Sequence, residues 1–255
     1  MTAILAILQA RVSSSRLPGK VLKPIIGRPM LALQIERVRQ AKKIDRLIIA
    51  TSTNPSDDDL ETLCQVIDVP CFRGSLDDVL DRFYQAAQAV KPEHIVRITG
   101  DCPLIDPEVI DDVITFYLAG NFNYASNSVE PTFPDGLDIE IFRFSALEEA
   151  WNEACRPSQR EHVTPFIYQH PDRYRIGHYK NTEDLSHLRW TVDEQEDFDL
   201  INKIYEALYP VMPNFRMADI LHLLEQRPEW LTINKQFERN EGLIKSLQED
   251  RTAET

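Results

Sequence analysis

The sequence predicts an α/β fold in which helices flank a mostly parallel central sheet. Short, nearly continuous apolar runs at residues 3–9, 46–51 and 94–99 are typical of strands that are buried on both faces. A helical pattern follows each run, at residues 29–42, 55–67 and 107–118. This alternation favours a parallel, doubly wound sheet, because each helix carries the chain back to begin the next strand.

The first half of the chain carries a start signal for each expected helix. Pro29 occupies a first-turn position of helix 29–42. Three aspartates at 57–59 give helix 55–67 an acidic first turn, which suits the positive end of the helix dipole. After a short strand at 70–72, Ser75 is expected to cap a helix that continues to residue 90, with Asp78 as the acidic partner of a capping box.

The second half continues with shorter elements. Gly100 and Pro103 end the strand 94–99, and helix 107–118 follows. Strands are then expected at 137–142 and 174–179, helices at 146–154, 161–170 and 194–208, and a short strand or turn at 187–191. We divide the chain into a domain of residues 1–208 and a helical C-terminal extension of residues 209–255. In the extension, helices are expected at 217–225 and 232–248, with a frayed end at 249–255.

The charge of the chain limits its partners. Its 28 basic and 41 acidic residues give a net charge of −13, which disfavours general binding to nucleic acid polymers or to a membrane surface. No apolar run approaches the ~20 residues needed to cross a bilayer, and the run at 3–8 is too short for the core of a signal peptide. The four cysteines are scattered without a C-x-x-C pattern, as expected for reduced core thiols in a cytoplasmic protein.

The N-terminal segment carries the opposite charge. Residues 1–46 contain ten basic and two acidic side chains, a net charge of +8, which indicates a local site for a small anion. The loop after the first strand, residues 9–20, reads QARVSSSRLPGK and combines three cations with three hydroxyl groups and a glycine. Guanidinium and ammonium groups bind phosphate oxygens. The loop is not a P-loop, because Ser14 and Val21 stand where that motif needs a glycine and a hydroxyl.

Three motifs in order along the chain carry a resemblance to a known family. They are ARVSSSRLPGK at 10–20, RITGDCPLI at 97–105 and LRWTVDEQEDF at 188–198. They resemble the signature A-R-x-x-S-x-R-L-P-G-K, the metal-binding G-D-x-P-L-I segment and the late D-x-x-E-D segment of the sugar cytidylyltransferases, which include the CMP-octulosonate and acylneuraminate enzymes. Residues 72–87, 134–142 and 160–168 are similar to the SpsF-like subgroup, named for spore coat polysaccharide biosynthesis. The resemblance covers about residues 3–208.

The resemblance implies a Rossmann-like fold of the nucleotide-diphospho-sugar transferase type. It also implies an enzyme that transfers CMP from CTP to an acceptor hydroxyl and releases pyrophosphate. Arg11, Arg16 and Lys20 would hold the β- and γ-phosphates, and these three with Asp101 are the expected catalytic residues. Asp101 and Asp193 would ligate Mg²⁺, since a hard cation prefers carboxylate and phosphate oxygens. The expected nucleotide contacts are Gln9, Ala10, Arg11, Ser13, Arg16, Lys20, Arg97 and Gly100.

The acceptor that the resemblance implies is a small acid sugar used in cell-surface polysaccharide biosynthesis. Cys102 stands where the octulosonate enzymes usually carry an acidic residue, which favours a nonulosonic or related acid sugar over octulosonate. Asp138 and Glu140 lie two positions apart on an expected strand, so both face one side of the sheet. The candidates for acceptor binding are Arg73, Asp138, Glu140, Glu161 and His162.

Simpler roles stay open for several of these residues. Asp101 could cap the turn before Pro103, and Asp193 could be the N-cap of the helix that follows it. Strand-edge solvation is as consistent with the pair at 138 and 140 as a pocket is, and the pair at 161–162 could be a satisfied surface pair.

Two other functions also stay open. One is a glycosyltransferase, or a nucleotidyltransferase that uses another nucleotide or a non-sugar acceptor. A D-x-D metal motif for a glycosyltransferase would need residues 57–59 or 197–199, and both fall in expected helices. The other is a non-catalytic binding protein on the same scaffold. The resemblance further implies a homodimer, for which residues 121–142 are the expected intersubunit arm.

Overall fold

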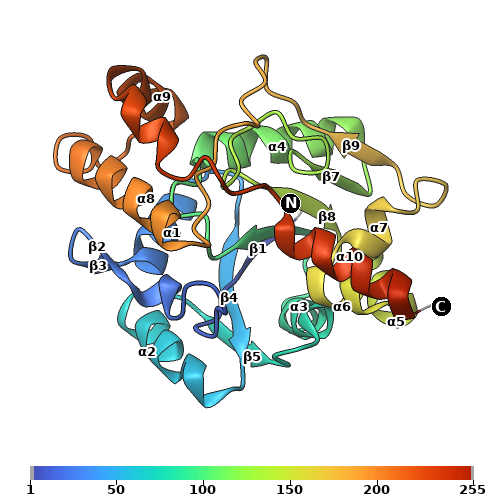
Figure 1. Ribbon diagram of the computed structural model, residues 1–255. Coiled ribbons are helices and arrows are strands. Elements are labelled where there is room, and N and C mark those ends of the chain that lie inside the picture. Colours follow the sequence, from blue (N-terminus) through green and yellow to red (C-terminus); the bar gives the residue numbers. More distant parts are fainter. Residues whose placement is uncertain (1–2, 254–255) are drawn as a thin grey trace.

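The computed structural model describes residues 3–253, in which helices cover both faces of a seven-stranded sheet (Figure 1). The strand order is β5-β4-β1-β6-β8-β7-β9, and β8 alone runs antiparallel to the others. The expected fold class is therefore confirmed. The strands of this sheet are β1 (Ile4–Gln9), β4 (Arg46–Ser52), β5 (Cys71–Gly74), β6 (His94–Thr99), β7 (Tyr124–Ser126), β8 (Glu140–Arg143) and β9 (Ile176–His178).

Ten α-helices and a small hairpin complete the described residues. The hairpin pairs β2 (Pro24–Ile25) with β3 (Arg28–Pro29). Three 3₁₀ helices are η1 (Lys20–Leu22), η2 (Pro55–Asp57) and η3 (Pro228–Thr232). The α-helices are α1 (Met30–Val38), α2 (Asp58–Val66), α3 (Val79–Gln88), α4 (Pro107–Gly120), α5 (Phe144–Glu153), α6 (Pro157–His162), α7 (Pro165–Tyr168), α8 (Gln195–Leu208), α9 (Met217–Gln226) and α10 (Glu241–Ala253).

The sheet separates two hydrophobic cores, and strand β1 contributes to both. Its side chains alternate, so Ile4, Ala6 and Leu8 pack with α1, α2, α4, α8 and α9, whereas Leu5 and Ile7 pack with α3, α5 and α7. Burial on both faces explains why the strand reads as a continuous apolar run in the sequence. The central strands are therefore rigid supports for the loops that follow their carboxyl ends.

The beginning of α3 differs from the expectation. Asp78, not Ser75, is the N-cap, because its Oδ1 accepts a hydrogen bond of 2.9 Å from the backbone N–H of Asp81. The hydroxyl of Ser75 instead accepts from the backbone N–H of Asp78 at 3.0 Å. Residues 75–78 therefore form a turn between β5 and α3, and this turn belongs to the site described below.

Several expectations for the second half are also corrected. The expected helix 161–170 is two short helices, α6 and α7, because Val163 has a positive φ of 70° between them. Residues 187–191, expected as a short strand or turn, begin in a turn closed by a 3.0 Å hydrogen bond from the N–H of Leu188 to the carbonyl of Leu185, and Arg189 then forms an isolated bridge with Asp135. The expected helix 232–248 begins only at Glu241, and residues 249–253 continue it rather than fraying. Residues 254 and 255 lie outside the described part, and the boundary at 208/209 stays a prediction.

Residues 121–142, expected as an intersubunit arm, are partly built into the sheet, and their role between subunits stays a prediction. They include β7 and the first residues of β8, which pair with each other and with β9 and β6 of the same chain. The expectation for the thiols is partly wrong, because Cys64 and Cys102 are buried but Cys155 is exposed. Among residues 3–253, no helix has the length and apolar character needed to cross a bilayer.

We predict that Gly100→Ala separates the carboxyl ends of β1 and β6. An added Cβ would lie 2.8 Å from the Cβ of Ala10 and 2.9 Å from the carbonyl oxygen of Gln9, which accepts a 2.7 Å hydrogen bond from the N–H of Gly100. Overpacking of this kind costs about 1–3 kcal/mol, which chemical denaturation would measure. Gly242→Ala is the control, because no atom lies within 4 Å of its added Cβ. Equal stability of the two variants would contradict the prediction.

Candidate active site

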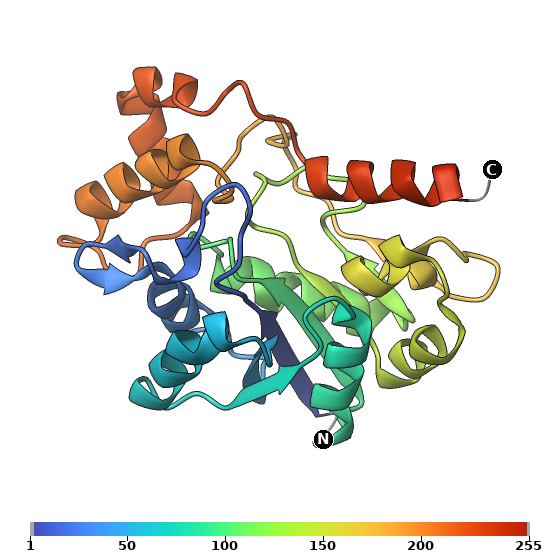
Figure 2. The same cartoon turned by 60° about the horizontal axis from the view of Figure 1, so that its bottom comes forward.

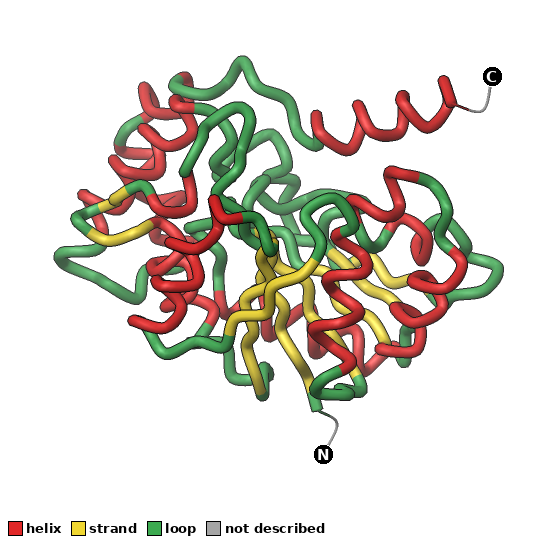
Figure 3. The backbone as a smooth tube through the Cα atoms, turned by 90° about the horizontal axis from the view of Figure 1, so that it is seen from below, coloured by secondary structure: helices red, strands yellow, loops and turns green. Residues whose placement is uncertain are grey.

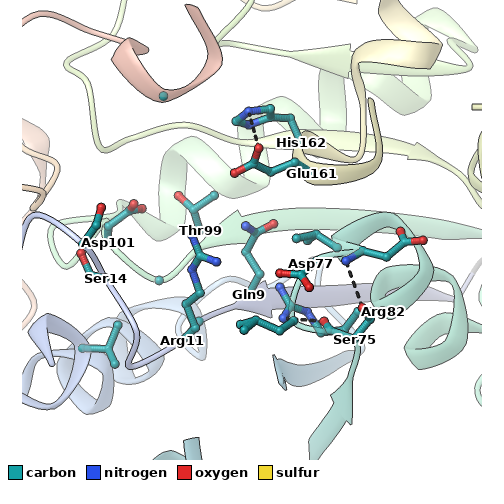
Figure 4. Close-up of a pocket in the computed structure, with 18 of the residues that line it drawn as sticks. Gln9, Arg11, Ser14, Ser75, Asp77, Arg82, Thr99, Asp101, Glu161 and His162 are labelled. Atoms are coloured by element: carbon teal, nitrogen blue, oxygen red, sulfur yellow. Dashed lines mark hydrogen bonds and ion pairs between the residues drawn. The ribbon is translucent and has the colours of Figure 1, made fainter. Parts of the chain in front are cut away.

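The carboxyl ends of β1 and β6 open into a cleft at the point where the strand order reverses. The chain places β4 and β5 on one side of β1 and β6 on the other, so the loops after β1 and β6 separate there. Ligands of open α/β sheets bind at such a point. The cleft has a volume of about 640 Å³, and we call it the first compartment (Figure 4). It is lined by parts of residues 9–21, 75–82, 99–101 and 157–162, together with Asp193 and Gly242.

The cationic loop after β1 is held in place by two backbone features. The N–H of Val12 donates a 2.7 Å hydrogen bond to Oδ1 of buried Asp57, whose other oxygen accepts from the backbone N–H and the hydroxyl of Ser52. Gly19 has a φ of +72° and donates a 3.0 Å hydrogen bond to the carbonyl of Val12, which closes the loop. The loop is therefore fixed to β4 by a carboxylate and turned back by a glycine.

Lys20 joins this loop to two carboxylates from distant parts of the chain. Its Nζ lies 2.9 Å from Oδ1 of Asp193 and 3.4 Å from Oδ2 of Asp101, and it donates a 2.7 Å hydrogen bond to the carbonyl of Val192. Burial acts to lower the pKa of Lys20, but the charges of Asp101 and Asp193 outweigh it, so that the pKa is raised. Lys20 is therefore charged, and it holds Asp101 and Asp193 side by side.

The two carboxylates that Lys20 bridges fit the chemistry of a hard cation. They share one ammonium group, so their oxygens face a common point at the mouth of the cleft. Although burial acts to raise the pKa of Asp101, the charge of Lys20 and a hydrogen bond with Thr99 lower it, so this carboxylate is ionised. The described residues contain no cluster of three metal-ligating side chains. A magnesium ion here would complete its coordination with phosphate oxygens and water.

Arg16 extends the same network toward the C-terminal end of the chain. Its Nη2 lies 2.9 Å from Oδ2 of Asp193, and its Nη1 lies 2.8 Å from Oε2 of Glu241 at the start of α10. Its Nε also lies 3.5 Å from Glu194. Arg16 is therefore surrounded by carboxylates and at the same time lines the first compartment.

A second pair of cations in the first compartment lacks carboxylate partners. Arg82 of α3 is only 2 % exposed, and its Nε has no hydrogen-bond partner among the described residues. Burial, and then the charge of Arg11, lower the pKa of Arg82 to about 10, which leaves it protonated at neutral pH. Arg11 itself makes no ion pair within the described residues, and Figure 4 shows both side chains on the floor of the cleft. Two guanidinium groups without an ion pair, of which Arg82 donates a 3.1 Å hydrogen bond only to the carbonyl of Ser75, favour an anionic ligand.

A second compartment of about 500 Å³ continues from Asp101 and Asp193 over β6 and β8. Arg97 of β6 forms an ion pair with Glu140 of β8, and its Nε donates a 3.1 Å hydrogen bond to Gln9. Glu140 also accepts hydrogen bonds from the hydroxyls of Tyr124 and Thr164. The floor of this compartment is therefore polar and nearly saturated with hydrogen bonds.

The far wall of the second compartment is an ion network around Arg189. Its guanidinium contacts Asp197 at 2.9 Å, Asp135 at 3.2 Å and Asp193 at 3.4 Å. Burial, together with the nearby charge of Asp138, raises the pKa of Asp135 to about 7. The network connects the carboxylate beside Lys20 to the loop that precedes β8, so the two compartments share one electrostatic system.

The structure places most of the expected site residues around the two compartments, and three of them lie elsewhere than expected. Ser13 lies outside both compartments, and Ser14 and Ser15 line the first one in its place. Arg97 lines the second compartment, not the first. Arg73 lies away from both, because its guanidinium is held by Asp58 and Glu61 on α2. The expected residues that line a compartment are Gln9, Ala10, Arg11, Arg16, Lys20, Arg97, Gly100, Asp101, Asp138, Glu140, Glu161, His162 and Asp193.

The sequence analysis does not identify three arginines of the site, Arg82, Arg189 and Arg239. Arg82 and Arg189 stand inside the segments 72–87 and 188–198 that carry the resemblance, so position within a motif was the available signal. Arg239 pairs with Asp138, which lies 101 residues earlier in the chain, and no local sequence pattern predicts such a pair.

A cationic loop at the switch point of a mostly parallel sheet, opposite a pair of carboxylates, is the site of a nucleotidyltransferase. The model of the cytidylyltransferase family matches residues 5–237, and the chain belongs to that family. Spore coat polysaccharide biosynthesis protein SpsF of Bacillus subtilis is 36 % identical over 244 residues, which cover 91 % of this chain and 98 % of that protein. The expectation of a sugar cytidylyltransferase-like, SpsF-like enzyme is therefore confirmed.

Solved structures agree with the fold. A cytidylyltransferase from Leptospira borgpetersenii has a TM-score of 0.87 and 29 % identity, covering 94 % of this chain and all of that one. The synthetase of CMP-2-keto-3-deoxy-manno-octonic acid, solved in complex with CTP, has a TM-score of 0.60 over 80 % of this chain and 98 % of its own. Its identity is 16 %, so this second likeness concerns the fold alone.

We predict that Asp57→Asn destabilises the protein in a pH-dependent way. Burial acts to raise the pKa of Asp57, but hydrogen bonds from Ser52 and Val12 lower it overall. A lowered folded-state pKa adds stability above the unfolded value of about 3.9, and this contribution is lost as pH falls through the folded pKa. The variant should therefore be about 1–3 kcal/mol less stable than the wild type at pH 7, and the gap should narrow below about pH 4.

Denaturant unfolding across pH 3–8 measures this gap. Asp59→Asn is the matched control, because Asp59 is exposed on α2 and should follow the wild-type pH profile. A constant gap between Asp57→Asn and the wild type at all pH values would contradict the role given to the Asp57 carboxylate.

Proposed function

We propose that the chain transfers CMP from CTP to a hydroxyl of an acid sugar, releases pyrophosphate and acts in cell-surface polysaccharide biosynthesis. The observation that carries the proposal is the first compartment, where Arg11, Arg16, Lys20 and Arg82 lie around one cleft beside Asp101. Four cations suit a triphosphate better than a single phosphate. The CTP complex of the octonic acid synthetase supports the choice of nucleotide on the same fold.

The residues of the cleft support an in-line displacement at the α-phosphate. The acceptor oxygen forms a bond to the α-phosphorus while the bond to the bridging oxygen of the β-phosphate breaks, and the hydroxyl proton passes to water. Positioning and neutralisation of developing charge supply most of the catalysis in such reactions. Arg11, Arg16 and Lys20 are placed to stabilise the pyrophosphate that leaves. Mg²⁺, when held by Asp101 and Asp193, would add positive charge at the α-phosphate.

The second compartment would receive the acceptor. It adjoins Asp101 and Asp193, so an acceptor there would reach the same α-phosphate. Arg97 and Arg189 line it in ion pairs with carboxylates, and such a set of charged donors and acceptors suits the polar groups of a sugar. We also propose a homodimer and a cytoplasmic location, both of which rest on the resemblance and on the charge and cysteine pattern of the sequence.

The deciding experiment is pyrophosphate release from each of the four common nucleoside triphosphates with Mg²⁺ and a panel of acid sugars. We expect release with CTP and at least one sugar, and little with ATP, GTP or UTP. Transfer from a nucleotide-sugar, with no release of pyrophosphate from any triphosphate, would overturn the proposal in favour of a glycosyltransferase.

Asp101→Asn tests the carboxylate that faces the metal. The substitution keeps the shape of the side chain but removes the negative charge, so kcat/KM should fall by at least about a hundredfold with an unchanged circular dichroism spectrum. Asp59→Asn is again the control, since it removes a charge of the same kind from an exposed helix position. Activity of Asp101→Asn within a few-fold of the wild type would exclude a metal-binding role for Asp101.

A further inference from the structure

Residues 238–253, near the end of the chain, cover one side of the second compartment, and we call this segment the roof. The family match ends at residue 237, yet six residues after that point line the compartment. Figures 2 and 3 show α10 on the side of the molecule opposite the N-terminus, beyond the carboxyl ends of the strands. These lining residues are Glu238, Asn240, Glu241, Gly242, Leu243 and Leu247.

The roof is attached to the body by polar contacts. Arg239 forms an ion pair with Asp138 and donates a 3.1 Å hydrogen bond to the carbonyl of Phe133. The carbonyl of Glu238 accepts a 2.9 Å hydrogen bond from Arg189. These bonds join the roof to the loop before β8 and to the wall of the second compartment.

Helix α10 is held on α6 in the same way. The hydroxyl of Ser246 donates a 3.1 Å hydrogen bond to Glu161 and lies 3.0 Å from Nε2 of His162. Asp250 accepts a 3.2 Å hydrogen bond from the backbone N–H of Ser158 and another from its hydroxyl. Glu161 and His162, but not Ser158, line the first compartment, so two of the three residues that anchor α10 belong to the cleft.

Three aliphatic side chains face the second compartment and belong to neither hydrophobic core. Leu243 and Leu247 lie four residues apart on α10, so they share one face of the helix, and both are half-buried. Val129 is 38 % exposed and lines the same compartment. Neither core includes any of the three. Half-buried aliphatic groups that turn toward a cavity provide an apolar surface for a ligand.

The opposite side of the compartment is charged. Asp101, Arg97, Glu140 and Arg189 line its floor and far wall. A ligand that fits between these two surfaces has polar groups on one side and an apolar group on the other. An apolar group placed against Leu243, Leu247 and Val129 would bind favourably, because contact removes apolar surface of both the ligand and the protein from water.

We propose that residues 238–253 are the acceptor-selecting element of the enzyme, and that Leu243, Leu247 and Val129 bind an apolar substituent of the acceptor. This assignment rests on the proposed function, because it requires the acceptor to occupy the second compartment. The substituent is of the acyl or methyl type, carried on a sugar whose hydroxyl groups face Asp101. Leu243 and Leu247 are specificity residues and take no part in the displacement.

The test compares acceptors that differ by one acyl group. The full-length enzyme with CTP and Mg²⁺ is assayed for pyrophosphate release with N-acetylneuraminate, with its de-N-acetylated amine and with 3-deoxy-octulosonate. We expect kcat/KM to favour the acylated sugar by roughly tenfold or more, the range that a small apolar group gains in a fitted pocket. In Leu243→Ala/Leu247→Ala the preference should fall to near one, while KM for CTP stays within about twofold.

Ile244→Ala is the matched control, because Ile244 lies on the same helix, is 46 % exposed and does not line the compartment. It should keep the wild-type preference, and Leu247→Met should restore most of the preference that Leu247→Ala loses. An unchanged preference in the double variant, or an equal loss in Ile244→Ala, would overturn the assignment. A parallel rise of KM for CTP would do the same.

Calorimetry with CTP distinguishes a failure of the role given to the roof from a failure of the proposed function. Binding of CTP without binding or turnover of any sugar in the panel would overturn the roof assignment and leave the nucleotide half of the proposed function standing. Absence of CTP binding would instead overturn the proposed function, and with it the assignment that rests on it.

Discussion

The ammonium group of Lys20 is the point on which the rest of the site depends. A charge with so little exposure is stable only when it is paired, and Asp101 and Asp193 supply the pairing. The three residues come from the loop after β1, the loop after β6 and the segment before α8, so one ammonium fixes three distant parts of the chain. Without Lys20, Asp101 would lose its ion-pair partner, whereas Asp193 would keep Arg16 and Arg189, so the carboxylate after β6 depends most on this ammonium group.

The balance of charge differs between the two ends of the cleft, so the positive charge that is free of ion pairs increases from one end to the other. Near Lys20 the cations and carboxylates form ion pairs, whereas Arg11 and Arg82 form none among the described residues, and Arg82 feels the charge of Asp57 only at longer range. The end without ion pairs has the charge that suits an anion, and the other end contains the two carboxylates that a metal would need. An anionic chain such as a triphosphate can therefore lie along the cleft with its charge increasing toward Arg11 and Arg82. In the sequence, the same feature is visible as the net charge of +8 on residues 1–46, which include Arg11, in a protein that is acidic overall.

Local chemistry explains what the sequence could predict. Strands β1, β4 and β6 were found because burial on both faces leaves an unbroken apolar run, and the cationic loop was found because its cations are adjacent in sequence. The cap of α3 was misplaced by three residues, since Ser75 and Asp78 both carry capping side chains and only the turn after β5 decides between them. Partnerships such as Arg97 with Glu140, or Arg239 with Asp138, are set by the strand order and by the path of the C-terminal segment. No periodicity within a window of the sequence encodes them.

The cationic loop and the roof are attached to the body by different kinds of contact, and substitutions in them therefore have different effects. The cationic loop is tied to β4 through Asp57 and to the carboxylates through Lys20, and its Ala10 and Leu17 belong to one hydrophobic core, so a change there disturbs the sheet ends and that core. The roof is joined by hydrogen bonds and ion pairs, and Leu243 and Leu247 add nothing to either core. A substitution at those leucines therefore changes the compartment without a cavity penalty elsewhere. The leucines of α10 can therefore change without disturbing the cationic loop, because the link between the two parts is polar, through Arg16 with Glu241 and Glu161 with Ser246, and does not involve these side chains.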